Sequence, residues 1–181
     1  ANDGLLRTYR LALSCTGEYA QYFGGTKAQA LAAMNNTMTR VNAVFMNDFA
    51  IKMVLIPEQE NIIFTNASTD PYSVATTGVD GAWNTELMNV LHGATYNIGD
   101  AKFDVGHLFG ATGGGGNAGC IACVCNNDTS YDSVEQWYWY KGQGFTSPAD
   151  AVPSGDNFDI DYVAHELGHQ FGANHTFTRA A

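Results

Sequence analysis

The sequence predicts an α/β or α+β fold, a layered structure in which helices pack against a β-sheet. Strand-like and helix-like segments alternate through the first half of the 181 residues, an order typical of such layers. Hydrophobic residues make up 45% of the chain and charged residues only 14%, so the chain can bury a core and disorder is not expected. No internal repeat or linker divides the chain, and its length fits one domain or part of a larger one.

The first third of the chain supplies a strand and a long helix. Residues 5–14 alternate well enough to form a strand. Gly24 and Gly25 then break the chain, and Thr26 is a suitable N-cap for the helix that follows. Between Lys27 and Phe49, apolar residues recur at spacings of three and four, which predicts one stripe of a long amphipathic helix: Leu31, Met34, Met38, Val41 and Phe45.

Short apolar runs beyond this helix predict further strands. Residues 51–56 are typical of a buried strand ended by Pro57, and residues 62–64 are expected to be a second strand or its continuation. Residues 103–109 predict another strand. Between these runs, a second helix is indicated by the spacing of four apolar residues: Leu87, Met88, Leu91 and Ala94.

The next segment is rich in glycine, cysteine and aromatic residues. Residues 112–119 form a glycine-rich loop without the Lys-Ser/Thr ending of a phosphate loop, so a nucleotide site is not expected. Residues 120–125 are small and apolar, and we expect them to form a strand. Residues 137–140 (Trp-Tyr-Trp-Tyr) are strand-like, although the sequence leaves their structure open.

The cysteines and the net charge narrow the class of protein. Cys15, Cys120, Cys123 and Cys125 favour disulfides in a secreted, extracellular protein. A structural zinc site at Cys120 and Cys123 is the alternative, but such a site needs a second pair of ligands and none is in sight. A net charge of −10 disfavours nucleic-acid binding, and no apolar run is long enough to cross a membrane.

One segment near the end of the sequence carries residues suited to catalysis. A helix is predicted over about residues 156–171. His165 and His169 lie four residues apart, so both imidazoles project from one helical face and can share a metal ion. Glu166 follows the first histidine and can lie beside the metal without binding it, where it would hold a water molecule.

A glycine and a third histidine complete this pattern. Gly172 can take the left-handed conformation that ends a helix, and the resulting turn would bring His175 back to the same ion. Three neutral imidazoles leave the fourth position of zinc open to water, and zinc is the default metal for such a nitrogen-rich site. The pattern H-E-x-x-H-x-x-G-x-x-H should occur by chance in on the order of one in 10^5 chains of this length. We therefore expect one catalytic zinc ion held by His165, His169 and His175.

The remaining polar candidates have simpler explanations. His107 is expected to be a hydrogen-bonded structural histidine in its strand, and His92 ends a helical pattern, where a polar side chain is ordinary. Asp159 or Asp161 could accept a hydrogen bond from a ligand imidazole, but with Asp156 they are better explained as acids at the start of a helix. Calcium is compatible with the excess of acidic residues, although no loop has a recognisable ligand spacing.

These groups predict hydrolysis of a peptide bond by a metal-activated water. Zinc lowers the pKa of its bound water and polarises the scissile carbonyl group. Glu166 would accept the proton of the water and pass it to the leaving amine, so no serine or cysteine nucleophile is needed. The alternative is a non-catalytic zinc-binding module derived from a metalloprotease, against which Glu166 argues because such a module needs no base.

With this signature, the chain resembles the metzincin zinc metalloproteases. The match covers His165 to His175, and the glycine with the third histidine separates it from enzymes with the shorter H-E-x-x-H motif. Within the metzincins the chain is similar to the reprolysin-like, adamalysin-related bacterial secreted proteases in four segments: residues 6–13, 16–19, 158–166 and 169–177. The pappalysin branch, which also has His-Thr-Phe after the glycine turn, is the runner-up.

The resemblance implies the N-terminal upper subdomain of a zincin-like catalytic domain. Such a subdomain has a twisted, mostly parallel sheet with an antiparallel edge strand above the cleft. Two long helices pack behind the sheet, here Lys27–Phe49 and the zinc helix. The edge strand should lie near residues 118–124, where it would bind an extended protein or peptide substrate by strand addition through Gly119, Cys120, Ile121 and Ala122.

The resemblance also bears on the extent of the chain. Metzincins place a methionine-containing turn beneath the zinc, downstream of the third histidine, whereas all five methionines here precede His165. We therefore expect residues 1–181 to be the zinc-binding subdomain without the C-terminal one, and weakly active or inactive alone. A C-terminal fragment of the same protein or a pro-segment would then be a partner. Cys125 would lack the partner that the C-terminal part supplies in related adamalysins.

Overall fold

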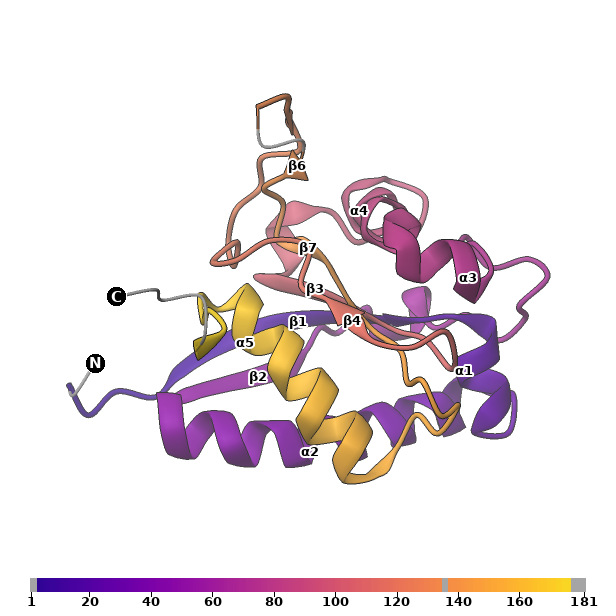
Figure 1. Cartoon of the computed structure of the whole chain (residues 1–181), viewed down its shortest axis with the longest axis horizontal. Coiled ribbons are helices and arrows are strands. Elements are labelled where there is room, and N and C mark those ends of the chain that lie inside the picture. Colours follow the sequence, from indigo (N-terminus) through magenta and orange to yellow (C-terminus); the bar gives the residue numbers. More distant parts are fainter. Residues whose placement is uncertain (1–2, 135–136, 177–181) are drawn as a thin grey trace.

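A five-stranded sheet forms the centre of the structure (Figure 1). The computed structural model describes residues 3–134 and 137–176. In spatial order the strands are β2 (Ile51–Leu55), β1 (Arg7–Cys15), β3 (Val105–Phe109), β7 (Gly142–Thr146) and β4 (Gly116–Asn117). The first four run parallel, and β4 pairs antiparallel with β7 at one edge. The predicted α/β architecture, a mostly parallel sheet with an antiparallel edge strand, is confirmed.

Helices cover both faces of this sheet (Figure 1). One face packs on α2 (Lys27–Phe49) and on the helix formed by η4 (Asn157–Ala164) and α5 (His165–Gln170). The other face packs on α4 (Trp83–His92). Alternate residues of the central strands enter the two cores, because successive side chains of a strand point to opposite faces. The short elements are α1 (Gly17–Tyr22), η1 (Gln59–Ile62), α3 (Ala75–Thr77), η2 (Gly78–Ala82), η3 (Asp100–Lys102), β5 (Tyr131–Asp132) and β6 (Trp137–Tyr138).

The long helix α2 has the bounds that the sequence predicts. Thr26 caps it, because its side-chain oxygen accepts a hydrogen bond from the backbone N–H of Gln29 at 3.3 Å. The helix ends where Ala50 adopts a left-handed conformation, with φ 55°. Four of the five predicted stripe residues are fully buried and the fifth, Leu31, packs against the same core: Met34, Met38, Val41 and Phe45. The methionines of the stripe are core residues, as expected.

The predicted strand at 62–64 is wrong. Residues up to Ile62 belong to the 3-10 helix η1, and only Ile63 forms an isolated bridge, to Cys15. The side chain of Gln59 explains the difference. Its Oε1 accepts from the backbone N–H of Leu13 at 3.1 Å, and its Nε2 donates to the carbonyl of the same residue. A side-chain amide thus occupies the pairing groups of β1 that a second strand would need.

The sequence also misplaced the strands beyond residue 109. The predicted strand at 120–125 is wrong, because Ala122 and Cys125 have left-handed backbones (φ 63° and 67°) and a disulfide closes the loop between Cys120 and Cys123. Of the aromatic run 137–140, only residues 137 and 138 form a strand, in a small hairpin with β5. The strand that joins the central sheet is β7, which the sequence analysis missed.

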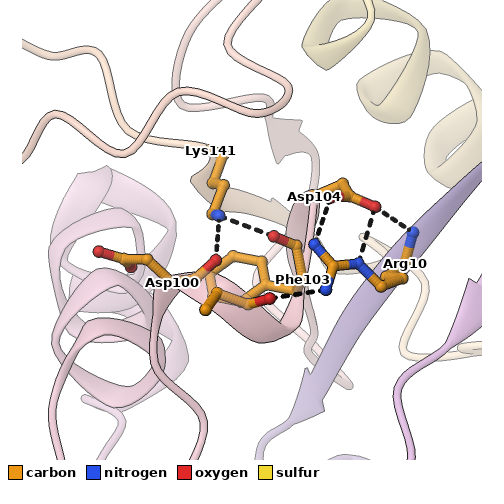
Figure 2. A network of polar contacts seen from close by, with 6 residues as sticks. Arg10, Asp100, Phe103, Asp104 and Lys141 are labelled. Atoms are coloured by element: carbon orange, nitrogen blue, oxygen red, sulfur yellow. Dashed lines mark hydrogen bonds and ion pairs between the residues drawn. The ribbon is translucent and has the colours of Figure 1, made fainter.

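Two basic side chains, those of Arg10 and Lys141, bind the loop that leads into β3 (Figure 2). The Arg10 guanidinium donates to the Asp104 carboxylate from Nη2 at 2.7 Å and from Nε at 3.1 Å. The ammonium of Lys141, which directly precedes β7, donates to the carbonyls of Asp100 and Phe103 at 2.6 and 2.7 Å. The loop is therefore tied to β1 on one side and to β7 on the other, and the Asp104 carboxylate is engaged by a guanidinium.

The second predicted helix corresponds to α4. Leu87, Met88 and Leu91 are buried against the sheet, whereas Ala94 lies beyond the last helical residue, His92. Within the described parts of the chain, residues 3–134 and 137–176, no helix is both long and apolar enough to span a membrane.

Candidate metal centre

The helix η4–α5 and the turn after it place the predicted residues. The first two histidines and Glu166 lie on α5, which ends at Gln170. Gly172 follows with φ 108°, a left-handed conformation that favours glycine. Its N–H donates to the carbonyl of His169 at 2.9 Å, closing the turn. The chain then reverses and carries His175 back toward the helix, as the spacing predicts.

The three imidazoles converge on one point. The Nε2 atom of His169 lies 3.0 Å from that of His165, and the Nε2 atom of His175 lies 3.1 Å from each of the other two. Among the histidine, cysteine and acidic side chains of the described residues, these three have ligand atoms that lie close enough together to hold a metal ion. The structure therefore brings together all three residues that the sequence nominated as ligands.

The donor set fits a zinc ion. The Nδ1 atom of His169 lies 2.6 Å from the carbonyl oxygen of Ala173, which can only accept, so the proton of a neutral ring is on Nδ1. Its Nε2 atom then offers a lone pair to the point where the other two rings meet. Four-coordinate zinc with nitrogen ligands at 2.0–2.1 Å requires nitrogen separations of about 3.3 Å, close to the separations found here. Burial, and then the neighbouring rings of His169 and His175, lower the pKa of His165, which favours the neutral form that binds metal.

Glu166 lies in the same cleft as the three imidazoles but is much less exposed than His165 or His175. Glu166 is only 7% exposed, and burial raises the pKa of its carboxyl group to about 7. The nearby His169 ring and a hydrogen bond from the backbone N–H of Ala118 act in the opposite direction. A Cβ atom added to Gly116 would lie 2.5 Å from Glu166 Cγ, so the carboxylate occupies the space that this glycine leaves. The side chain of Glu166 thus fills the space between its own helix and β4.

The cleft runs along the edge of the sheet. Its lining comes from the segment at and after β4 and from the zinc helix and its turn: Gly116, Asn117, Ala118, Gly119, Cys120, Ile121, His165, Glu166, His169, Asn174 and His175. Three of the four residues nominated for substrate binding, Gly119, Cys120 and Ile121, are in this lining. Ala122 is not, and its N–H instead donates to the carbonyl of His169 at 3.1 Å.

The prediction of an edge strand at 118–124 is wrong in position. The edge strand β4 is Gly116–Asn117, and residues 118–125 form bends and turns. Gly116, Asn117 and Ala118 also belong to the cleft, although they were not among the predicted site residues. The signal that could have found them is the run of glycines at 113–116, because an edge approached by another main chain favours residues without side chains.

The acids near the start of the zinc helix bind another helix, and not a ligand imidazole. Asp159 is buried and accepts hydrogen bonds from Thr37 Oγ1 and Arg40 Nη1, both at 2.7 Å. Asp156 forms an ion pair with the same Arg40 and makes no capping bond. Asp156 and Asp159 thus lie at the start of the helix, as expected, but they bind Arg40 and Asp159 does not support a ligand imidazole. Asp161 is exposed.

The remaining histidines and cysteines lie outside the cluster of three imidazoles. His107 is fully buried and hydrogen-bonded, and His92 ends α4 with its Nδ1 2.9 Å from Asp100 Oδ2. Cys120 and Cys123 form a disulfide, so the alternative of a zinc site at these residues is wrong. Cys15 is a buried thiol, and Cys125 is an exposed thiol without a disulfide partner in the described chain.

Comparison with known families agrees with this geometry. The sequence profile of the family described as "Metallo-peptidase family M12B Reprolysin-like" matches residues 6–180. No curated protein matches the chain. The profile covers the strands of the central sheet, the edge strand, the zinc helix and the histidine after the glycine turn. The chain belongs to the reprolysin-like metallopeptidases of family M12B.

Proposed function

We propose that this protein is a secreted zinc endopeptidase that hydrolyses peptide bonds in extended protein or peptide substrates. One observation carries the proposal. Three imidazole Nε2 atoms meet within 3.1 Å of one another beside a buried carboxylate, in a cleft bordered by the edge of a sheet. Residues 1–181 would form the N-terminal, zinc-binding subdomain of the catalytic unit.

The residues of the cleft have distinct roles in this proposal. His165, His169 and His175 would hold the ion, which would supply a Lewis acid and lower the pKa of a bound water. Glu166 takes a proton from the attacking water and delivers it to the leaving amine. A base works best when its pKa is near the working pH, and burial moves the pKa of the Glu166 carboxyl toward that range. The N–H of Ala118 holds the carboxylate in place.

The edge strand is suited to bind the substrate main chain. One side of β4 pairs with β7 (Figure 1). The residues of β4 also line the cleft. An extended peptide added to this edge would form main-chain hydrogen bonds, as in strand addition. Gly116, Ala118 and Gly119 are small enough to allow close approach of a second backbone. The substrate-binding role nominated for residues 119–122 is thereby proposed for the segment 116–121.

The disulfide supports secretion. Disulfides persist in oxidising, extracytoplasmic compartments and are rare in the cytosol. The Cys120–Cys123 bridge closes the loop that borders the cleft. The proposal therefore places the enzyme outside the cell.

Zinc content and hydrolysis of an unfolded protein substrate test the function. The full-length wild type should retain one zinc ion per chain and cleave the substrate, and a chelator should abolish cleavage. Glu166→Gln should keep the zinc and lose at least about 100-fold in kcat, because the base is lost while the ligands remain. His169→Ala should lose both zinc and activity. His92→Ala is the matched control, since this histidine lies outside the cluster, and should change neither.

Three results would contradict the proposal in whole or in part. Wild-type protein that binds zinc but does not cleave would favour the non-catalytic zinc-binding module. A Glu166→Gln variant as active as an active wild type would refute the role of Glu166 as the base. Wild-type protein that binds no zinc would exclude both functions.

A further inference from the structure

The last residue of the zinc helix is tied to the central sheet through its side chain. Gln170 is only 1% exposed. Its Nε2 atom donates to the carbonyl of Gly106 at 3.0 Å, and its Oε1 atom lies 2.8 Å from His107 Nδ1. Gln170 lies four residues after Glu166, so the two side chains share one face of the helix. The side chain anchored in the sheet and the predicted base therefore point in the same direction from the helix axis.

The hydrogen-bond chain behind Gln170 has one consistent direction. The Gly106 carbonyl can only accept, so the amide NH2 of Gln170 faces it and Oε1 faces His107. His107 must then donate from Nδ1, which leaves Nε2 as an acceptor in the neutral ring. The Thr146 hydroxyl, 2.8 Å away, donates to that nitrogen. All four residues are buried, and burial lowers the pKa of His107 to about 4, so the ring stays neutral.

The sheet leaves space for this chain of side chains. A Cβ atom added to Gly144 would overlap the Gln170 amide and would lie 2.6 Å from His107 Nδ1. The strand β7 therefore carries a glycine where the two side chains cross it. The pairing of β3 and β7 also shifts register between Gly106 and His107, at the residues that receive Gln170.

The hydrogen-bond chain ends at Thr146, on a strand that pairs with the edge of the cleft. Thr146 is the register partner of Gly116 in the β7–β4 pair, and Gly116 is the residue on which Glu166 packs. The contacts thus form a closed path from Glu166 through β4 and β7 to His107, and back through Gln170 and one helical turn. The hydrogen-bonded part of this path, from Gln170 through His107 to Thr146, is buried, and such a network resists distortion more than separate contacts do.

We propose that Gln170, held by His107 and Thr146, is a positioning residue that fixes the rotation of the zinc helix about its axis. The proposal rests on the proposed function, because the group that it positions is the base Glu166. Side chains project about 5–6 Å from a helix axis, so a rotation of about 10° would displace Glu166 by about 1 Å. A displacement of about 1 Å at a catalytic group can reduce the rate on the order of 100-fold.

Two substitutions interrupt the chain of hydrogen bonds at its two ends. Gln170→Leu keeps the size of the side chain and removes both of its hydrogen bonds. Thr146→Val keeps the shape of the residue and removes the hydroxyl, and Thr146→Ser restores the hydroxyl. Gln59→Leu is the matched control, because Gln59 is also a buried glutamine bound to a strand backbone, but it contacts β1 and Met34, outside the cleft.

The readouts separate positioning from loss of stability. In the zinc-loaded, folded full-length protein, Gln170→Leu should lower kcat about 10- to 100-fold with KM within about twofold of the wild type. Thr146→Val should lower kcat about three- to tenfold, and Thr146→Ser should recover most of that loss. Cobalt-substituted Gln170→Leu should show a changed visible absorption spectrum, because His169 precedes the altered residue. Gln59→Leu should lower the melting temperature while kcat and the cobalt spectrum stay unchanged.

Each outcome decides one of the two proposals. An active wild type with Gln170→Leu no more impaired in kcat than Gln59→Leu, or Thr146→Ser no better than Thr146→Val, would overturn the positioning role alone. If Gln170→Leu does not fold, the Thr146 pair decides the question in the same way. A wild type that binds cobalt but is inactive would end the proposed function, and with it a positioning role for its base.

Discussion

At the scale of single residues, the position of Glu166 in the cleft depends on the absence of a side chain at Gly116. Glu166 has the carboxylate that the chemistry requires, but a buried carboxylate needs space and a hydrogen-bond donor. Gly116 supplies the space and the N–H of Ala118 supplies the hydrogen bond. Both residues belong to the edge segment that would receive substrate. In the proposed function, the same short stretch of chain would thus position both the base and the substrate.

A methyl group at residue 116 should therefore impair catalysis without removing the metal. The Cβ atom of Gly116→Ala would lie 2.5 Å from Glu166 Cγ, so the carboxylate must move. We expect kcat to fall about 10- to 100-fold while zinc content stays at the wild-type level. Gly168→Ala is the control, because its Cβ would meet only Ala173 Cβ, at 4.0 Å, in an ordinary contact. Steady-state kinetics and metal analysis check the pair, and equal activity of the two variants would contradict this role of Gly116.

At the scale of elements, the zinc helix is anchored by polar groups at both ends. Near its start, Asp159 binds Thr37 and Arg40 of α2. At its end, Gln170 binds β3 through Gly106 and His107. The helix is therefore fixed to a second helix and to the sheet, on either side of His165 and His169. Buried hydrogen bonds of this kind have a specific geometry, which apolar packing alone does not provide.

The burial of His107 predicts that the folded protein loses stability in acid. The pKa of His107 is about 4 in the folded state and about 6.5 in an unfolded chain, so the unfolded state binds the proton first as pH falls. The contribution of His107 to stability is thus complete above pH 6.5 and decreases as pH falls toward 4. Between pH 7.5 and pH 5 this residue should lower the free energy of unfolding by about 2 kcal/mol.

Urea denaturation of the metal-free protein at these two pH values measures the effect. The variant His107→Gln has no titrating group at this position. Between pH 7.5 and pH 5, its free energy of unfolding should therefore decrease by about 2 kcal/mol less than that of the wild type. The other titrating groups are common to both proteins and cancel in the comparison. The same pH dependence in both proteins would contradict the assignment of a buried, neutral His107.

At the scale of the whole molecule, the sequence predicts best what depends on local spacing. The bounds of α2 follow from its apolar period and its Thr26 cap, and the convergence of the three histidines follows from a helical turn and a glycine. Both features need only the geometry of a helix and of one left-handed residue. For this reason the bounds of α2 and the convergence of the three imidazoles could be derived without a structure. The fold class followed separately from the alternation of strand-like and helix-like segments.

Features that depend on distant partners could not be derived in this way. β7 contains two glycines within five residues, so it lacks the apolar alternation that indicates a strand, and its packing against Gln170 requires one of them. The edge strand was misplaced because nothing in the residue types of Ala122 and Cys125 shows their left-handed backbones. The bond between His107 and Gln170 joins residues 63 positions apart, and its partners are visible only once the sheet has formed.

The central claim is that three histidines hold one zinc ion, and X-ray absorption at the zinc edge tests it most directly. The zinc-loaded protein should show one tightly bound zinc per chain, with nitrogen ligands at about 2.0–2.1 Å and the scattering of three imidazole rings. The variant His175→Ala should lose one of these rings. Sulfur ligands at about 2.3 Å would place the metal on the cysteines, and this result, or a wild type that retains no zinc, would contradict the account.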